Sequence, residues 1–272
     1  MEILRLENIS HKYETKQNYT IRDISFYLKK GECLAIIGES GVGKTTLFQT
    51  ISGLLCPTSG KILFHGEDIT GQPGHVGYML QKDLLLAHKT IEDNIALPLL
   101  IRRSEERTKK RTPDSARVKH IDKTLPNRMD KQTARGIVRE HLADFGLADY
   151  AKAYPRELSG GMRQRAALLR TYMTGCEITL LDEPFSALDA ITKRSMHSWY
   201  LSMAKKLELS TIFITHDIDE AIFLADRIVV LRGPVGHIED ILSVPRGSHD
   251  TDFQLSPEYA SLKRKIFSAL RV

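Results

Sequence analysis

Alternating apolar and polar residues mark the beginning of the chain. Residues 3–9 and 21–28 repeat with a period of two, which is typical of strands that bury one face. Residues 32–37 are instead almost continuously apolar and lie between Gly31 and Gly38, which predicts a strand buried on both faces. We therefore expect a small antiparallel sheet, followed by the first strand of a parallel sheet.

A helix is predicted immediately after that buried strand. Leu47, Ile51 and Leu54 have helical spacing within residues 44–55, and the pattern stops near Pro57. The turn at residues 57–60 then leads into a short strand at 61–64. The order of strand, glycine-rich loop, helix and strand indicates an α/β fold.

The rest of the chain continues the α/β pattern after a helical section. Helices are predicted at 91–100, 133–145 and 218–225, and strands at 178–181, 210–214 and 228–231. After Gly236 the chain ends in a tail with a short amphipathic helix, which is capped by Ser256 and has Pro257 in its first turn. This tail is too short to form a separate domain.

Composition limits the class of protein. The 272 residues are 42% hydrophobic and 27% charged, as in ordinary globular proteins. No apolar run approaches the roughly 18 residues of a spanning helix, and the N-terminus lacks the layout of a secretory signal. Cys33, Cys56 and Cys176 are scattered, which argues against a disulfide framework and a zinc site. We interpret all three as buried thiols.

Positive charge is concentrated in one segment. The net charge is +5, yet residues 102–135 alone carry twelve basic and five acidic side chains. Such a segment suits either a solvated insertion or a patch for nucleic acid or anionic lipid. It lacks aromatic residues for base stacking, and Pro113 and Pro126 break any long helix. The solvated insertion is the favoured interpretation, and no nucleic-acid partner is expected.

A phosphate-binding loop follows the first buried strand. Residues 38–45 read Gly-Glu-Ser-Gly-Val-Gly-Lys-Thr, and the loop lies between a predicted strand and a predicted helix. Lys44 is expected to reach the terminal phosphates of ATP, and the Thr45 hydroxyl to bind Mg²⁺. The other residues expected to cradle the nucleotide are Gly38, Ser40, Gly41, Gly43 and Thr46.

Two adjacent acids end the predicted strand at 178–181. Ligands of open α/β sheets bind at the carboxyl ends of strands, so Asp182 is expected beside the phosphate loop, where it holds Mg²⁺. Glu183 points the other way and is a candidate base for the attacking water. A solvated acidic turn is the alternative, but the strand context and the phosphate loop argue against it.

One further motif links the chain to a known family. Residues 158–164 read Leu-Ser-Gly-Gly-Met-Arg-Gln and precede Asp182 and Glu183, a layout that resembles ABC transporter ATPase subunits. In that family Ser159, Gly160 and Gly161 would close on a nucleotide held by the other subunit. The resemblance therefore implies a homodimer, or a pair of ABC ATPases, with nucleotide at the interface.

The resemblance implies roles for several further residues of this sequence. Tyr13 lies where the family places an aromatic ring against adenine. Gln81, after the predicted strand at 76–80, resembles the glutamine that contacts Mg²⁺ and the attacking water. His216 resembles the histidine that contacts the terminal phosphate. Residues 186–189 resemble the loop that joins the two sites of the dimer.

The resemblance also implies an architecture. The expected fold is α/β, with a P-loop NTPase core of the RecA-like, ABC ATPase type, an antiparallel β subdomain and an inserted helical subdomain. The expected division is residues 1–82 and 168–235 for the core with its N-terminal antiparallel sheet, 83–167 for the helical subdomain and 236–272 for the tail.

The family further implies membrane partners. Permease subunits would dock near residues 81–100 at the cytoplasmic face of the cell membrane, with a solute-binding protein as an indirect partner. Residues 184–192 and 215–221 resemble the importers of nitrate, sulfonate and taurine, although an ATPase never touches the solute. The alternative is a soluble ABC ATPase acting on nucleic acid, ribosomes or cluster assembly. Such proteins usually carry two ATPase units or a long coiled coil, and the sequence shows one unit and no sustained heptads.

Overall fold

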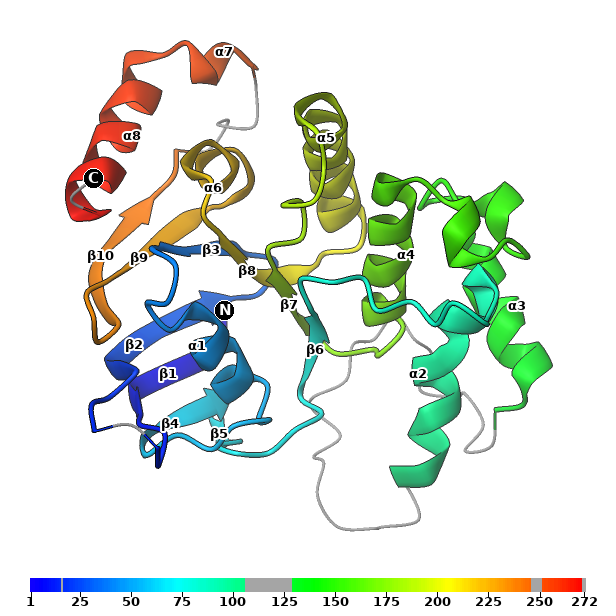
Figure 1. Cartoon of the computed structure of the whole chain (residues 1–272), viewed down its shortest axis with the longest axis horizontal. Coiled ribbons are helices and arrows are strands. Elements are labelled where there is room, and N and C mark those ends of the chain that lie inside the picture. Colours follow the sequence, from blue (N-terminus) through cyan, green and yellow to red (C-terminus); the bar gives the residue numbers. More distant parts are fainter. Residues whose placement is uncertain (16, 106–128, 246–250, 271–272) are drawn as a thin grey trace.

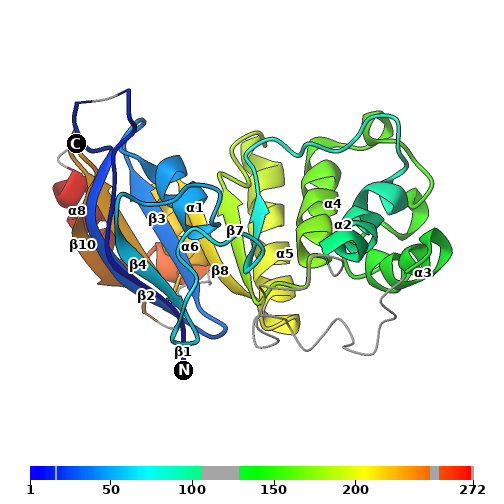
Figure 2. The same ribbon diagram turned by 90° about the horizontal axis from the view of Figure 1, so that it is seen from below.

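The computed structural model describes residues 1–15, 17–105, 129–245 and 251–270. Two sheets lie at one end of the molecule, and helices α2, α3 and α4 lie at the other (Figures 1 and 2). No helix in the described part of the chain is long and apolar enough to cross a membrane. The two sheets and the helices confirm the predicted α/β class, whereas the exact division into subdomains stays a prediction.

The first sheet is antiparallel. It contains β1 (Glu2–His11), β2 (Ile21–Lys29), β4 (Ser59–Phe64) and β5 (Glu67–Asp68), in the order β2-β1-β4-β5. Leu4 pairs with Leu28 on one side and with Phe64 on the other, and all three side chains are buried. The alternating patterns at 3–9 and 21–28 thus predicted two neighbouring strands of this sheet, β1 and β2.

The second sheet is mostly parallel and has the order β10-β9-β3-β8-β7-β6. Its strands are β3 (Cys33–Gly38), β6 (Val76–Met79), β7 (Ile178–Asp182), β8 (Ser210–Thr215), β9 (Arg227–Arg232) and β10 (His237–Ser243). Only β10 runs antiparallel to its neighbour among these pairings. Because β3, β7 and β8 are buried along their whole length, their sequences are mostly apolar and do not alternate.

Helices surround this second sheet and extend beyond it. The α-helices are α1 (Lys44–Ile51), α2 (Ile91–Glu105), α3 (Lys131–Leu142), α4 (Gly160–Tyr172), α5 (Ala190–Lys206), α6 (Ile218–Leu224), α7 (Thr251–Gln254) and α8 (Pro257–Leu270). Two 3-10 turns, Ala148–Tyr150 and Pro155–Glu157, precede α4. Helix α5 lies between the sheets and α4, so it joins the two ends of the molecule (Figure 2).

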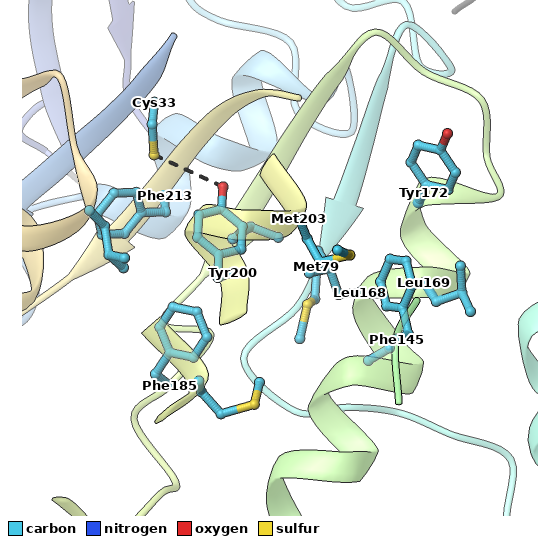
Figure 3. Packing of buried hydrophobic residues seen from close by; sticks show 14 of the residues in the cluster. Cys33, Met79, Phe145, Leu168, Leu169, Tyr172, Phe185, Tyr200, Met203 and Phe213 are labelled. Carbon is cyan, nitrogen blue, oxygen red and sulfur yellow. Dashed lines mark hydrogen bonds between the residues drawn. The ribbon is translucent and has the colours of Figure 1, made fainter. Parts of the chain in front are cut away.

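One hydrophobic cluster runs from the second sheet into the helices. Figure 3 shows Tyr200 of α5 with its hydroxyl directed at Cys33 of β3, 3.9 Å from its Sγ, and Phe185 next to the Tyr200 ring. Burial raises the pKa of the Cys33 thiol well above its usual range. This packing fixes α5, and the loop that precedes it, against the parallel sheet.

Three expectations were wrong in detail. Helix α1 ends at Ile51 instead of 55, because Gly53 takes a positive φ of 74°, and Leu54 is 68% exposed. Only Cys33 is fully buried, since Cys56 is exposed and Cys176 is partly exposed. The tail contains a strand, β10, which the sequence did not suggest. Its mostly exposed face gives no apolar alternation.

The basic segment is only partly within the described residues. Residues 106–128 lie outside them, so the interpretation as a solvated insertion is not tested there. At its end, however, Arg135 of α3 contacts Asp93 at 2.8 Å and Glu92 at 3.3 Å, and Lys131 contacts Asp93 at 3.1 Å. The two carboxylates belong to the first turn of α2 and are nearly buried. Part of the positive charge therefore joins two helices.

Candidate functional site

Polar side chains meet where the parallel strands end. The loop after β3 carries Lys44, β7 ends at Asp182, β8 is followed by His216, and Gln81 follows β6. The register of β3, β8, β7 and β6 is parallel throughout, so all four carboxyl ends lie on one edge of the sheet. This edge is where ligands of open α/β sheets bind.

The glycine-rich loop has the geometry that its sequence predicts. Gly41 and Gly43 have positive φ values of 85° and 104°. A Cβ on Gly43 would also lie 2.5 Å from Cγ2 of Ile21, so a larger residue does not fit. These positions let the backbone turn tightly ahead of α1, whose N-terminus favours an anion. Ser40 and Thr45 are exposed on this loop, and Gly38 and Thr46 are buried.

Lys44, the first residue of α1, is buried next to the loop. Its Nζ donates to the carbonyl oxygens of Gly38, at 2.7 Å, and Glu39, at 3.0 Å. Burial lowers the pKa of this ammonium group, while the nearby carboxylates of Glu183 and Asp182 oppose that change. The group thus has acidic partners on the facing strand ends and is held by backbone oxygens of its own loop.

Asp182 is the buried acid of the site. Burial raises the pKa of its carboxyl group, and a hydrogen bond from the Tyr78 hydroxyl, at 3.2 Å, acts in the opposite direction together with Lys44. Tyr78 belongs to β6, the neighbouring strand, and sequence reasoning did not find it. A single tyrosine within a strand carries no local signal of a contact to a residue 104 positions away.

Glu183 is the most connected residue of the site. Its backbone has a positive φ of 46°, which turns the side chain away from the strand direction. Gln81 Nε2 donates to Oε2 at 3.0 Å, and Nδ1 of His216 lies 3.4 Å from Oε1. The structure therefore brings all three residues together, although they come from three different strand ends. His216 is 60% exposed, so its ring is accessible from solvent.

The donor set suits a small, hard cation. The Thr45 hydroxyl, the Gln81 amide and the Asp182 carboxylate offer oxygen ligands of the kind that Mg²⁺ prefers. Within the described residues, no cluster of three or more His, Cys, Asp or Glu could hold a metal. Mg²⁺ usually takes one or two protein carboxylates and completes its shell with substrate phosphates and water, so these three residues would be enough to hold it.

Tyr13 lies next to the start of α1. Its hydroxyl is 3.2 Å from Oγ1 of Thr46, and the edge of its ring meets His11, with centroids 4.7 Å apart. The side chain is partly exposed. It therefore stands beside the phosphate loop.

The Ser159 turn, Ser159–Gly161, is set apart from this edge. Ser159 caps α4 by accepting a hydrogen bond from the Met162 backbone N–H at 3.3 Å. A Cβ on Gly161 would lie 3.3 Å from Cγ2 of Thr192 at the start of α5. Among the described contacts, none joins the Ser159 turn to the phosphate loop. The chain thus carries two separate sets of predicted nucleotide-binding residues.

A network of charged residues begins directly after His216. Asp217, the next residue, caps α6 by accepting from the backbone N–H groups of Asp219 and Glu220. Lys193 of α5 contacts Asp217 at 2.8 Å and Glu220 at 3.3 Å. These interactions, led by the hydrogen bond from Lys193, hold the pKa of Asp217 below its usual value against the effect of burial. Sequence analysis missed this network. Its one local signal is Asp217 placed directly before a predicted helix.

Known proteins resemble most of this chain. The family profile described as ABC transporter matches residues 21–186. The formylaminopyrimidine import ATP-binding protein ThiZ of Halalkalibacterium halodurans is 36% identical over 272 residues, covering 99% of this chain and 96% of ThiZ. The aliphatic sulfonates import ATP-binding protein SsuB of Bacillus thuringiensis subsp. konkukian is 35% identical over 250 residues, covering 89% and 88%.

A solved structure supports the same fold. The ATP-binding cassette MJ0796, described as a dimer in a post-hydrolysis state with ADP and Pi, matches with a TM-score of 0.68 at 24% identity. The match covers 89% of this chain and 99% of MJ0796. With a profile match over more than half of the chain and relatives aligned along nearly all of it, this protein belongs to the ABC transporter family and is one of its ATPases.

Proposed function

We propose that the chain binds and hydrolyses ATP to power a membrane importer of a small solute. The observation that carries the proposal is the convergence of Lys44, Asp182 and Glu183 at one sheet edge, with Gln81 and His216 both directed at Glu183. The end of β3 leads to the phosphate-binding cation, and the end of β7 supplies both the metal-binding acid and the candidate base. Such a combination serves phosphoryl transfer to water.

The phosphate loop would bind the triphosphate. The backbone of Gly38–Thr46 faces the anion at the start of α1, and Lys44 exchanges its carbonyl partners for terminal phosphate oxygens. Tyr13 offers its ring to adenine. Thr45, Gln81 and Asp182 would hold Mg²⁺, which neutralises phosphate charge when bound.

Glu183 would act as the base. Its carboxylate orients a water molecule and accepts the proton that this water loses as it attacks the terminal phosphate. Gln81 fixes one carboxylate oxygen through its amide, and His216, beside the other oxygen, would contact the terminal phosphate. Asp182 is buried and accepts from Tyr78, whereas Glu183 contacts Gln81 and His216, so the two acids would take different tasks.

The complete site would need a second copy. The Ser159 turn exposes Ser159 at a helix N-terminus, a suitable environment for phosphate, yet it makes no described contact with the chain's own loop. Head-to-tail pairing of two chains would bring each turn to the other chain's nucleotide. MJ0796, a protein of the same fold, is described as a dimer.

Membrane partners follow from the family and from one surface. The segment after β6 exposes Leu80, Leu84 and Leu86, which are apolar residues close to Gln81. Permease subunits at the cytoplasmic face of the membrane would dock here, so that ATP binding and release move this segment. ThiZ is named as an import protein for formylaminopyrimidine and SsuB as one for aliphatic sulfonates. These names support a small solute, such as a nitrate- or sulfonate-like anion, delivered by a solute-binding protein.

A pull-down tests this function. The tagged Glu183→Gln chain, loaded with ATP, is used as bait in gently solubilised membranes of the source cells, because slowed hydrolysis would hold the complex together. The matched control is tagged Lys44→Ala, which should not bind ATP. We expect a multi-spanning protein with the first bait and much less of it with the second.

The same experiment distinguishes the alternative. Recovery of ribosomes, nucleic acid or cluster-assembly proteins without any spanning protein would contradict the importer and support a soluble ABC ATPase. If a permease is recovered, the ATPase activity of the reconstituted complex is measured with nitrate, sulfonates and formylaminopyrimidine in turn. The solute that raises ATP turnover then identifies the cargo.

A further inference from the structure

The C-terminal helix α8 lies outside the proposed chemistry but is firmly attached to the core. Leu262, Ile266 and Leu270 are buried at helical spacing, and the helix packs against α6 and β9. Figure 1 shows α8 beside α6, the helix that begins directly after His216. The apolar face of α8 thus fixes its position relative to the strand ends of the site.

Two polar side chains of α8 contact Asp219 of α6. Tyr259 and Lys263 are four residues apart, so both face the same direction. The Tyr259 hydroxyl donates to Oδ1 of Asp219, and Lys263 Nζ lies 2.6 Å from that same oxygen. Lys263 also lies 5.8 Å from the centre of the Tyr259 ring. Three side chains therefore form one cluster between the two helices.

Asp219 belongs to the turn that carries His216. Its backbone N–H donates to Oδ1 of Asp217 at 3.0 Å, and Asp217 follows His216 directly. On the opposite side, Lys193 of α5 holds the other carboxylate oxygen of Asp217 at 2.8 Å. The His216 turn, residues 216–219, is consequently held by α5 on one side and by α8 on the other.

We propose that α8 positions His216 for catalysis, with Tyr259 and Lys263 acting as positioning residues through Asp219. The inference rests on the proposed role of His216 in ATP hydrolysis. Neither Tyr259 nor Lys263 would touch the nucleotide. They restrict the motion of the His216 turn, so that its imidazole stays beside Glu183, from which it is 3.4 Å away.

The expected effect is on the rate and not on ATP binding. Exposed ion pairs contribute little to stability, and Asp219 is about half exposed. Small displacements of a catalytic group nevertheless reduce turnover strongly, by up to about 100-fold for 1 Å. Loss of the cluster should therefore lower kcat by roughly three- to tenfold, because only one side of the turn is released, and leave KM for ATP nearly unchanged.

Two measurements on the full chain test the proposal. The variant is Tyr259→Phe with Lys263→Met, and the matched control is Lys265→Met, which removes an exposed lysine from the same helix. Hydrogen exchange followed by mass spectrometry should show several-fold faster exchange in the peptide covering residues 216–221 of the variant only. ATPase kinetics should show the lower kcat at constant KM, and Lys263→Arg alone should retain the wild-type rate.

The outcomes separate this inference from the proposed function. Exchange needs no ATP, so unchanged protection of residues 216–221 in the double variant overturns the positioning role whatever the chain hydrolyses. Equal kcat in the double variant and Lys265→Met also overturns it. If the double variant loses cooperative unfolding, the single Tyr259→Phe variant is measured instead. An inactive wild-type chain contradicts the proposed function but leaves the exchange result to decide on α8.

Discussion

The edge of the parallel sheet and the Ser159 turn differ in how completely one chain builds them. At the sheet edge, residues from three strand ends contact one another, since Glu183 has both Gln81 and His216 as partners. At the Ser159 turn, the Ser159 side chain contacts only its own helix among the described interactions. The side chains of the sheet edge thus find partners within one chain, whereas Ser159 remains exposed at the N-terminus of α4.

The difference suggests that ATP binding and ATP hydrolysis depend on different parts of the molecule. A single chain has the loop and the acids that hold a nucleotide, so ATP binding should require no partner. In the proposed function, hydrolysis would also need the Ser159 turn of a second chain, so turnover would depend on the approach of that chain. Variants at the two regions should therefore fail in different ways.

The largest expected effect is at the sheet edge, in Glu183→Gln. Because glutamine cannot accept the proton of the attacking water, turnover should fall by about 10²- to 10⁴-fold. ATP binding should persist, since Lys44 and the phosphate loop are untouched. Size-exclusion chromatography with ATP should show a stable dimer, and phosphate release should be nearly absent. Normal turnover in this variant would remove Glu183 from the site.

Lys44→Ala should fail earlier, at binding. Removing a buried cation that pairs with a charged ligand typically costs about 2–5 kcal/mol, equivalent to roughly 30- to several thousand-fold in affinity. Titration with a fluorescent ATP analogue measures this loss, with exposed Lys61→Ala as the control for an equal change of charge. Wild-type affinity in Lys44→Ala, or a dimer formed by it with ATP, would contradict the comparison.

The sheet edge was predictable because its signals are local. The phosphate loop is contiguous, and Asp182 with Glu183 follows a continuous apolar strand, so parallel pairing alone brings them together. The contacts of Tyr78 with Asp182 and of Lys193 with Asp217 join distant segments through side chains, and single residues carry no trace of such pairs. Strand β10 escaped notice for another reason, since its exposed face lacks apolar alternation.

The Ser159 turn itself is tested by complementation. Gly160→Asp places a negative charge and a Cβ in the turn, so a homodimer of this variant should be inactive although each chain still binds ATP. Lys44→Ala chains are inactive for the opposite reason. Mixed in equal amounts, the two variants should regain activity, up to about a quarter of the wild-type rate. Each mixed dimer contains one intact composite site of two, and at most half of the dimers are mixed if the chains pair at random.

The complementation result has a clear opposite. If the Ser159 turn serves the nucleotide of its own chain, mixed dimers pair one chain without a phosphate site and one without a turn, and the mixture stays inactive. Recovery has to vanish when Gly160→Asp and Lys44→Ala are combined in one chain and mixed with Glu183→Gln, since no dimer then has a complete site. The comparison between the two regions depends on this pair of results.

The smallest expected effect concerns Asp182, the buried acid of the sheet edge. Burial raises the pKa of Asp182, and the hydroxyl of Tyr78 counteracts this by stabilising the charged carboxylate. Tyr78→Phe keeps the ring, whose edge packs on Phe48 with centroids 5.8 Å apart, but deletes the donor. One hydrogen bond of about 0.5–1.5 kcal/mol corresponds to roughly 0.4–1 pH unit.

The pKa of Asp182 should therefore rise further in Tyr78→Phe, and a metal-binding acid has to be ionised to work. The acid limb of the pH profile of kcat/KM should move to higher pH by that amount, while activity above the limb stays near wild type. Exposed Tyr150→Phe serves as the control and should leave the limb in place. A limb that does not move, or moves to lower pH, would mean that Asp182 takes no part in the rate-limiting steps, and the sheet edge would then have one working acid, Glu183.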